Sequence, residues 1–206
     1  MNKISSLEAL LEHYEEPVER ALWKEIDHIN HHYQQFIEAS PFLILATYGE
    51  KGIDCSPRGD PAGFVRVADK HHLLIPDRRG NNRIDSLKNV VVNKKVGLIF
   101  LIPNAGESIR VSGSAEILID ETLCDSFAVQ GKPASSVLSV KVDKAYFQCQ
   151  KAAARSSLWD PSTYIDRKTL PTAGEMAKYF SEQQGVNFDN KAYDANYSEH
   201  MKKTIY

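Results

Sequence analysis

The chain has 206 residues, 42% of them hydrophobic, and a formal net charge of −2 at pH 7. This length suits one domain, and the near-neutral charge excludes a protein that binds nucleic acid through its overall charge. The three cysteines, Cys55, Cys124 and Cys149, lie far apart without a CxxC pair, which argues against a disulfide framework or a zinc knuckle. We find neither the apolar core of a signal peptide nor a run long enough to span a membrane, and we expect a cytoplasmic protein without nucleic-acid or membrane partners.

The first part of the chain changes from helical to strand periodicity. Residues 5 to about 38 carry apolar side chains at helical spacing, with Ser6 as a modest N-cap and a restart at Pro17. Ser40-Pro41 ends this segment. Two hairpins are predicted next, from "FLILATY" (42–48) with "IDCSPRG" (53–59), and from "GFVRVAD" (63–69) with "HLLIP" (72–76).

The second part alternates strands with short helices. A helix beginning near Asn82 is predicted from the spacing of Ile84, Leu87 and Val91. The remaining elements are strands over 95–103, 107–118 and 136–150, a helix over 120–131 with Asp120 as its cap, and a helix over about 151–158. After Pro171 the tail is polar, and it is either an arm packed on a neighbour or partly disordered.

Together these elements predict a mainly β fold with flanking helices. Six or so antiparallel strands joined by hairpins favour a closed or nearly closed barrel, because closure removes exposed strand edges. We expect an N-terminal helical segment packed on the barrel (1–40), the barrel itself (41–165), and a C-terminal polar tail or arm (166–206).

Common catalytic and metal-binding motifs are missing from the sequence. There is no GxSxG nucleophile motif, no P-loop and no GxGxxG. His28 and His32 stand four apart in the helical segment, a spacing that can hold a metal. Since no third ligand is visible, a solvated helix face is the favoured interpretation and no metal site is predicted.

A cationic cluster follows two strands. Ser56 and Arg58 lie where one strand breaks at Pro57, and "PDRRGNNR" (76–83) leads directly into a helix start. Free backbone N–H groups and the helix dipole favour an anion there, and arginines add planar donors for phosphate oxygens. The alternative is a solvated turn in which Asp77 pairs with an arginine. Two such turns together favour a phosphate-bearing ligand, and a small barrel without a P-loop suggests FMN, with the strand end "LLIPD" (73–77) beside its ring.

Several segments resemble the pyridoxamine 5'-phosphate oxidase-like flavoproteins, and more narrowly an uncharacterised bacterial branch of that family. They are "SPRGDP", "IPDRRGNNR", "VGLIFLIP", "ESIRVSGSA" and "CQKAAARSSLW", and the similarity spans about residues 40 to 160. The resemblance implies an FMN-binding split β-barrel, antiparallel and Greek-key-like. It also implies a homodimer with two FMN sites at the subunit interface.

The resemblance also implies which residues contact the cofactor. Ser56 and Arg58 match a strand that contacts FMN, and Asn82 and Arg83 match the basic pair that holds its phosphate. Ser108 falls where the family places a polar side chain on the ring. The full set of expected cofactor-binding residues is Ser56, Arg58, Ile75, Pro76, Asp77, Arg78, Asn81, Asn82, Arg83, Ser108, Lys151, Arg155 and Trp159, the last three on a segment brought to the cofactor by the partner subunit.

The sequence departs from the true oxidases in one informative place. Those enzymes carry a Trp-Arg…Arg-Leu stretch that clamps the substrate, and no such pattern follows Trp159. Oxidation of pyridoxamine phosphate is therefore not expected. The prediction is an FMN-dependent oxidoreductase for an unknown small molecule; the alternatives are a non-catalytic flavin-binding, haem-binding or sensor protein, and a relative that binds the deazaflavin F420.

Overall fold

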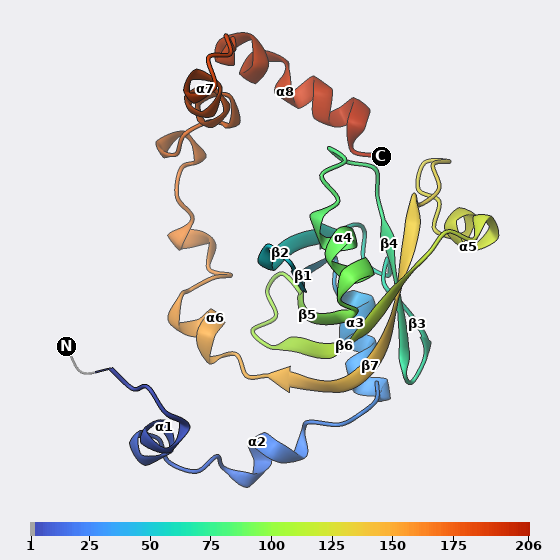
Figure 1. Ribbon diagram of the computed structural model, residues 1–206, viewed down its shortest axis with the longest axis vertical. Coiled ribbons are helices and arrows are strands. Elements are labelled where there is room, and N and C mark those ends of the chain that lie inside the picture. The colour runs from blue at the N-terminus through green and yellow to red at the C-terminus, as the bar shows by residue number, and fades with distance from the viewer. Residues whose placement is uncertain (1–2) are drawn as a thin grey trace.

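In a computed structural model, residues 3–206 form one seven-stranded antiparallel sheet with helices around it (Figure 1). Its order is β2-β1-β5-β6-β7-β4-β3, and among the described residues the edge strands β2 and β3 are not paired with each other. The predicted split barrel is thereby confirmed. The strands are β1 (Phe42–Gly49), β2 (Gly52–Gly59), β3 (Arg66–Asp69), β4 (His72–Asp77), β5 (Lys95–Leu101), β6 (Ser108–Leu118) and β7 (Ser136–Gln148).

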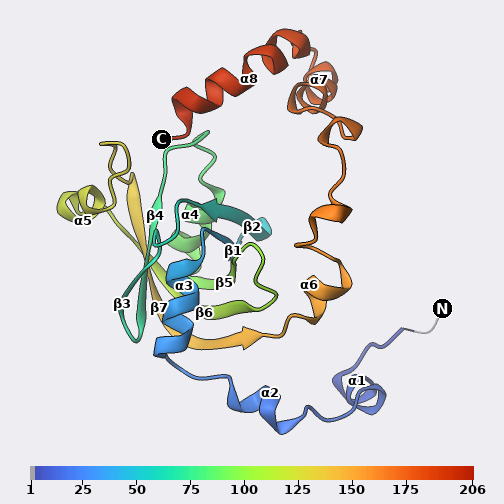
Figure 2. The same ribbon diagram turned by 180° about the vertical axis from the view of Figure 1, so that it is seen from behind.

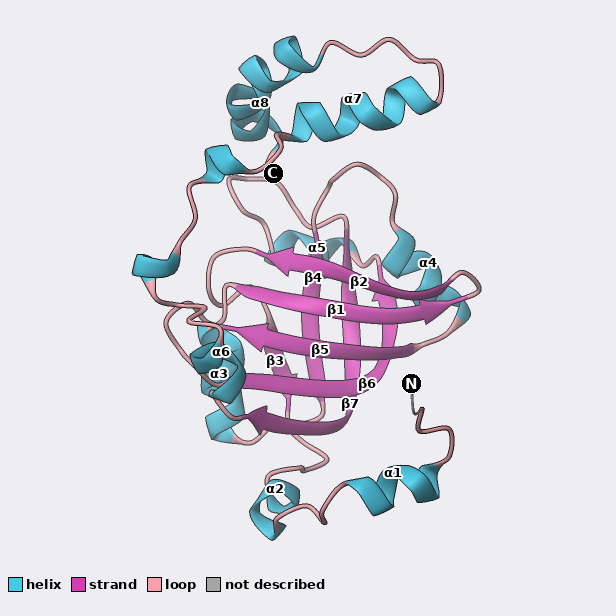
Figure 3. Ribbon diagram, turned by 90° about the vertical axis from the view of Figure 1, so that its left-hand side faces the viewer, coloured by secondary structure: helices cyan, strands magenta, loops and turns pink. Residues whose placement is uncertain are grey.

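The sheet curls at its two longest strands, β6 and β7, which connect β5 on one side to β4 on the other. Figure 3 shows β2, β1, β5, β6 and β7 face on, with β3 and β4 behind them. The pairing register of β6 and β7 shifts between Ser112 and Gly113, and such a bulge bends and twists a strand. A Cβ atom at Gly113 would lie 2.1 Å from the Lys141 carbonyl oxygen, so this bend requires glycine.

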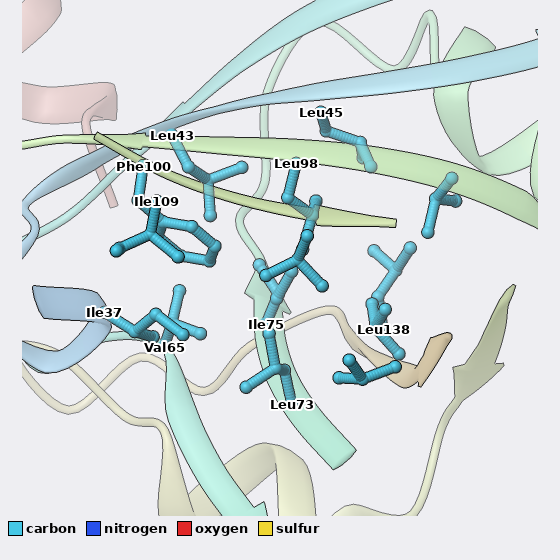
Figure 4. Packing of buried hydrophobic residues seen from close by; sticks show 14 of the residues in the cluster. Ile37, Leu43, Leu45, Val65, Leu73, Ile75, Leu98, Phe100, Ile109 and Leu138 are labelled. Atoms are coloured by element: carbon cyan, nitrogen blue, oxygen red, sulfur yellow. The ribbon is translucent and has the colours of Figure 1, made fainter. Parts of the chain in front are cut away.

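One apolar core fills the space that the curled sheet encloses (Figure 4). Alternate residues of β1, such as Leu43 and Leu45, point into it, as the strand period predicts. Helix α3 (His31–Ala39) adds Tyr33 and Ile37, and helix α4 (Asp85–Val92) adds Val90. A smaller cluster lies under helix α5 (Glu121–Ser126).

The N-terminal segment differs from the predicted helical run over 5–38. It forms three helices, α1 (Leu7–His13), α2 (Glu19–Trp23) and α3, and Ser6 caps the first by accepting from the Ala9 amide. Between α2 and α3 the chain is not helical, because Ile26 forms an antiparallel bridge with Ala145 of β7. His28 therefore lies outside any helix, and its predicted helical spacing to His32 is wrong.

The C-terminal segment is helical and stands away from the barrel. After α6 (Lys151–Arg155) and two short 3-10 turns, η1 (Pro161–Thr163) and η2 (Arg167–Thr169), α7 (Ala173–Gln183) and α8 (Asn190–Thr204) form a hairpin. Asp194 joins its helices by accepting from the Thr172 hydroxyl at 2.6 Å and the Gly174 amide at 2.9 Å. Figures 1 and 2 show this hairpin at one end of the molecule and α1 and α2 at the other.

Among residues 3–206, no helix combines the length and apolar character that crossing a membrane requires. In the same residues, no group of three or more histidine, cysteine or acidic side chains is placed to hold a metal ion.

Candidate functional site

The cationic residues that the sequence singles out converge on one cleft, here called the β2–β4 cleft. It has a volume of about 900 Å³ and lies between β2, the turn after β4, and the start of α4. Apolar side chains of Ile117 and Ile119 form part of its wall. The predicted residues that line it are Ser56, Arg58, Asp77, Arg78, Asn81, Asn82 and Arg83.

Arg58 and Asp77 join the two strands that flank the cleft. Arg58 donates from Nη1 to Asp77 Oδ1, and the two side chains are only 17% and 11% exposed. The Nε of Arg58 is buried and has no hydrogen-bond partner among the described residues. Buried donors in folded proteins almost always have a hydrogen-bond partner. This unpaired N–H is therefore available to an acceptor that binds in the cleft.

Arg78 is held in place by other parts of the chain. Its Nε donates to Asp60 at 2.7 Å and its Nη1 donates to the Phe127 carbonyl oxygen at 2.8 Å. The Asp60 side chain is 2% exposed, and it also accepts from the Tyr206 hydroxyl at 2.6 Å. This hydrogen bond and partial burial raise the pKa of Tyr206. Arg78 therefore connects the cleft to the end of α8, and its main donors are already used.

The turn after β4 ends in an unusual helix start. Asn82 and Ile84 both have positive φ values, 59° and 46°, and a β-branched residue such as Ile84 rarely adopts this conformation. No side chain caps α4, and its first intrahelical bond runs from Lys88 to the Ile84 carbonyl at 3.0 Å. The amides at the start of α4 are therefore free, and the helix dipole favours an anion there. Strain of this kind is typical of functional sites.

The helix begins at Asp85, three residues after the predicted start near Asn82. Asp85 also pairs with Arg83, whose Nε and Nη2 lie 2.9 and 2.7 Å from Oδ2. This hydrogen bond raises the pKa of Arg83 and lowers the pKa of Asp85. With its side chain 77% exposed, Arg83 is an exposed cation at the rim of the cleft.

Comparison with protein families gives a match to pyridoxamine 5'-phosphate oxidase over residues 29–149, more than half of the chain. The chain belongs to the pyridoxamine 5'-phosphate oxidase family. A comparison with curated proteins finds no match.

Several solved structures of low sequence identity are similar to part of this chain. HupZ of Group A Streptococcus is 20% identical, with a TM-score of 0.46 over 57% of this chain and 91% of its own. A candidate pyridoxamine 5'-phosphate oxidase from Lactobacillus delbrueckii is 18% identical, with a TM-score of 0.48 over 59% and 95%. An FMN-binding protein from Syntrophomonas wolfei is 13% identical, with a TM-score of 0.43 over 55% and 82%.

The other predicted site residues of this family member do not line the β2–β4 cleft. Ile75 and Pro76 are buried, and Ile75 belongs to the core. Ser108 is buried at the start of β6, and two strands, β1 and β5, separate β6 from β2. Lys151 and Arg155 are exposed on α6, and the Trp159 indole donates to the Ala105 carbonyl at 2.8 Å.

Sequence reasoning missed the parts of the cleft that arrive from distant segments. Ser86 anchors α4 on β2 by donating to Asp54 at 2.7 Å. A serine four residues after the predicted start of a helix gives no signal of such a role. Other lining residues outside the predicted set are Ile117, Ile119, Ser135 and Ser136, which come from the end of β6, the residue after it, and the start of β7.

Proposed function

We propose that this chain binds FMN in the β2–β4 cleft and uses it as an oxidoreductase acting on a small molecule. The observation that carries the proposal is the buried, unpartnered Nε of Arg58, which lines the same cleft as the uncapped start of α4. A phosphate group accepts hydrogen bonds from both kinds of donor. The donor set fits the phosphate of FMN. Membership of the family is a second, independent support for this cofactor.

The cleft offers each part of such a cofactor a suitable surface. Arg58 and the free amides of α4 would hold the phosphate, with Asn82 at the turn beside them. Ile117 and Ile119 would give the ring an apolar wall. When bound, FMN supplies the redox chemistry, and the chain supplies position and electrostatics.

The side chains in the cleft favour redox chemistry over acid–base catalysis. The lining of the cleft includes no histidine. Each lining carboxylate already accepts a hydrogen bond: Asp54 from Ser86, Asp77 from Arg58, and Asp85 from Arg83. Carboxylates held in this way are poor general bases, whereas a redox step on a flavin requires no side-chain base.

The site would be completed by a second copy of the chain. Lys151, Arg155 and Trp159 lie outside the cleft of their own chain, and a homodimer with sites at its interface would bring them there from the partner. Helix α1 supports this proposal, because it buries no side chain and exposes Leu7, Leu10, Leu11 and Tyr14 at helical spacing.

Three experiments test these proposals. The purified protein should show flavin absorbance, and mass spectrometry of the released ligand should identify FMN; a colourless protein that takes up no added FMN would refute the proposal. Light scattering should give a dimer at micromolar concentration. In addition, mixing an Arg58→Ala chain with a Trp159→Ala chain should restore one intact site per heterodimer, which neither homodimer has.

A deazaflavin is the alternative that this site supports, because F420 also carries a phosphate and the same donors would hold it. The protein would be produced in a host that contains both cofactors. Release of F420 in place of FMN on denaturation would then favour the deazaflavin alternative. A non-catalytic binder is distinguished by adding a reduced nicotinamide without oxygen. Rapid bleaching of the bound flavin supports the enzyme, and a flavin that never turns over supports the binder.

A further inference from the structure

A second cavity, here called the α3 pocket, shares no lining residue with the β2–β4 cleft. It lies between α3, the extended segment before it, and the neighbouring ends of β6 and β7. Its volume of about 500 Å³ falls within the range of small-molecule sites, about 300 to 1,000 Å³. Four aromatic side chains, Trp23, Tyr33, Phe36 and Phe147, line it.

The aromatic side chains of the pocket differ in their exposure to solvent. Tyr33 is buried, whereas the Trp23 side of the pocket is open to solvent, with that residue 70% exposed. A large exposed aromatic surface beside a cavity is costly in water, and an apolar group in the pocket would cover it. The pocket therefore favours a ligand with an apolar or aromatic body.

Lys24 brings a positive charge to this apolar pocket. Its Nζ lies 4.8 Å from the centroid of the Phe147 ring. Its backbone is fixed, because the Tyr33 hydroxyl donates to the Lys24 carbonyl at 2.5 Å and Ile26 bridges Ala145 with bonds of 3.0 and 2.7 Å. Lys24 as a residue is half-buried, and no carboxylate of residues 3–206 forms an ion pair with its ammonium group.

Glu107 brings a negative charge to the same pocket. Ile109 stands opposite Phe147 in the ladder of β6 and β7, and Glu107 lies two residues before Ile109. Both residues line the pocket, Ile109 from β6 and Glu107 from the position just before that strand. Within the described part of the chain, Glu107 has no ion-pair partner either. A cation and an anion, both without an ion-pair partner, thus share one aromatic pocket with the polar side chains of Asn30 and His32.

We propose that the α3 pocket binds a small zwitterion with an apolar body, of the class of aromatic or branched α-amino acids. The ligand carboxylate pairs with Lys24, its ammonium group pairs with Glu107, and its side chain lies among the aromatic rings. A ligand with a carboxylate alone would face the unpaired charge of Glu107, and one with an amine alone would face Lys24. This pocket shares no lining residue with the β2–β4 cleft, in which the flavin is proposed to bind.

Calorimetry with three probes that share a phenyl group tests the proposal on the full chain: L-phenylalanine, 3-phenylpropionate and 2-phenylethylamine. L-phenylalanine should bind most tightly. Lys24→Gln should weaken its binding at least about tenfold, the value of one charge-assisted hydrogen bond. Glu107→Gln should weaken L-phenylalanine to a similar extent and strengthen 3-phenylpropionate. The control Lys141→Gln, an exposed β7 residue outside the pocket, should leave binding unchanged.

Clear results would overturn this assignment. One is that the unaltered protein shows no saturable binding of L-phenylalanine at millimolar concentration, and another is that it binds 3-phenylpropionate more tightly than L-phenylalanine. Equal affinity of Lys24→Gln and the unaltered protein for L-phenylalanine would be the third such result. Binding of L-phenylalanine only after Leu10→Asp would also overturn the assignment, because it would show that the apolar face of α1 from a second copy occupies the pocket. Trp23 emission, measured in a Trp159→Phe background, should shift on binding. Because no readout involves flavin, this proposal and the FMN proposal can fail separately.

Discussion

Replacing Arg58 by lysine separates its two roles in the β2–β4 cleft. The ammonium group of lysine can still pair with Asp77, which is buried and needs a cationic partner. Lysine cannot, however, offer the second, fixed donor that the unpartnered Nε provides. We therefore expect Arg58→Lys to fold almost as stably as the unaltered protein and to bind FMN more weakly.

The magnitude follows from the donor that is lost. A hydrogen bond to a charged group contributes about 1.5–3 kcal/mol, which corresponds to about 10- to 150-fold in the dissociation constant of FMN. Arg58→Ala should show the same loss of affinity and also a loss of stability. Since it leaves the Asp77 carboxylate unpaired with its side chain 11% exposed, the free energy of unfolding should fall by about 3–5 kcal/mol.

Flavin fluorescence quenching measures the affinity, and urea unfolding of flavin-free protein measures the stability. Arg20→Lys is a matched control, because Arg20 is exposed on α2 and lies outside the cleft. Unchanged FMN affinity in Arg58→Lys would refute the role of Nε. An equal loss of stability in Arg58→Lys and Arg58→Ala would show that the ion pair with Asp77 does not act as described.

Three further predictions concern separate parts of the chain. Arg83→Ala should weaken FMN binding by less than about tenfold, with the difference vanishing at high salt, because Arg83 is exposed and must leave Asp85 to reach the phosphate; a larger, salt-independent loss measured by fluorescence would contradict this. Gly113→Ala should lower the free energy of unfolding by about 1–3 kcal/mol in urea denaturation, because its Cβ would overlap the Lys141 carbonyl. The raised pKa of Tyr206 means that its hydrogen bond stabilises the arm below the usual tyrosine pKa and is lost as pH rises through the folded value. Proteolysis of the C-terminal arm should therefore accelerate in strongly alkaline solution, and Tyr206→Phe should already be accelerated at neutral pH.

The strands and the cationic turn were predictable because their signals are local. Alternation fixes the inward residues of β1, and Gly80 with Asn81 and Asn82 marks the turn before α4. The N-terminal segment was not predictable in the same way. Its apolar spacing continues through Ile26, yet the chain there is extended, because a bridge to Ala145 far along the sequence outweighs local helical preference.

The roles of the arginines could not be predicted for the same physical reason. Arg58, Arg78 and Arg83 look equivalent in the sequence, since each stands in a polar stretch at or just after the end of a strand. Their partners distinguish them: Arg78 is fixed by Asp60 and by the Phe127 carbonyl, 18 and 49 residues away. Which guanidinium remains free is thus decided by tertiary contacts, which no pattern of neighbouring residues encodes.

This division of roles explains how the cleft can attract an anion while its arginines are mostly paired. Asp60, Asp77 and Asp85 each engage one arginine, so the local charge is nearly balanced. Besides the exposed Arg79, which forms no ion pair among the described residues, the unpaired donors have fixed directions: one buried guanidinium N–H and the backbone amides at an uncapped helix start. Selection by fixed donors of this kind depends on geometry more than on net charge. Such a cleft should therefore retain a phosphate at salt concentrations that screen an exposed cationic patch.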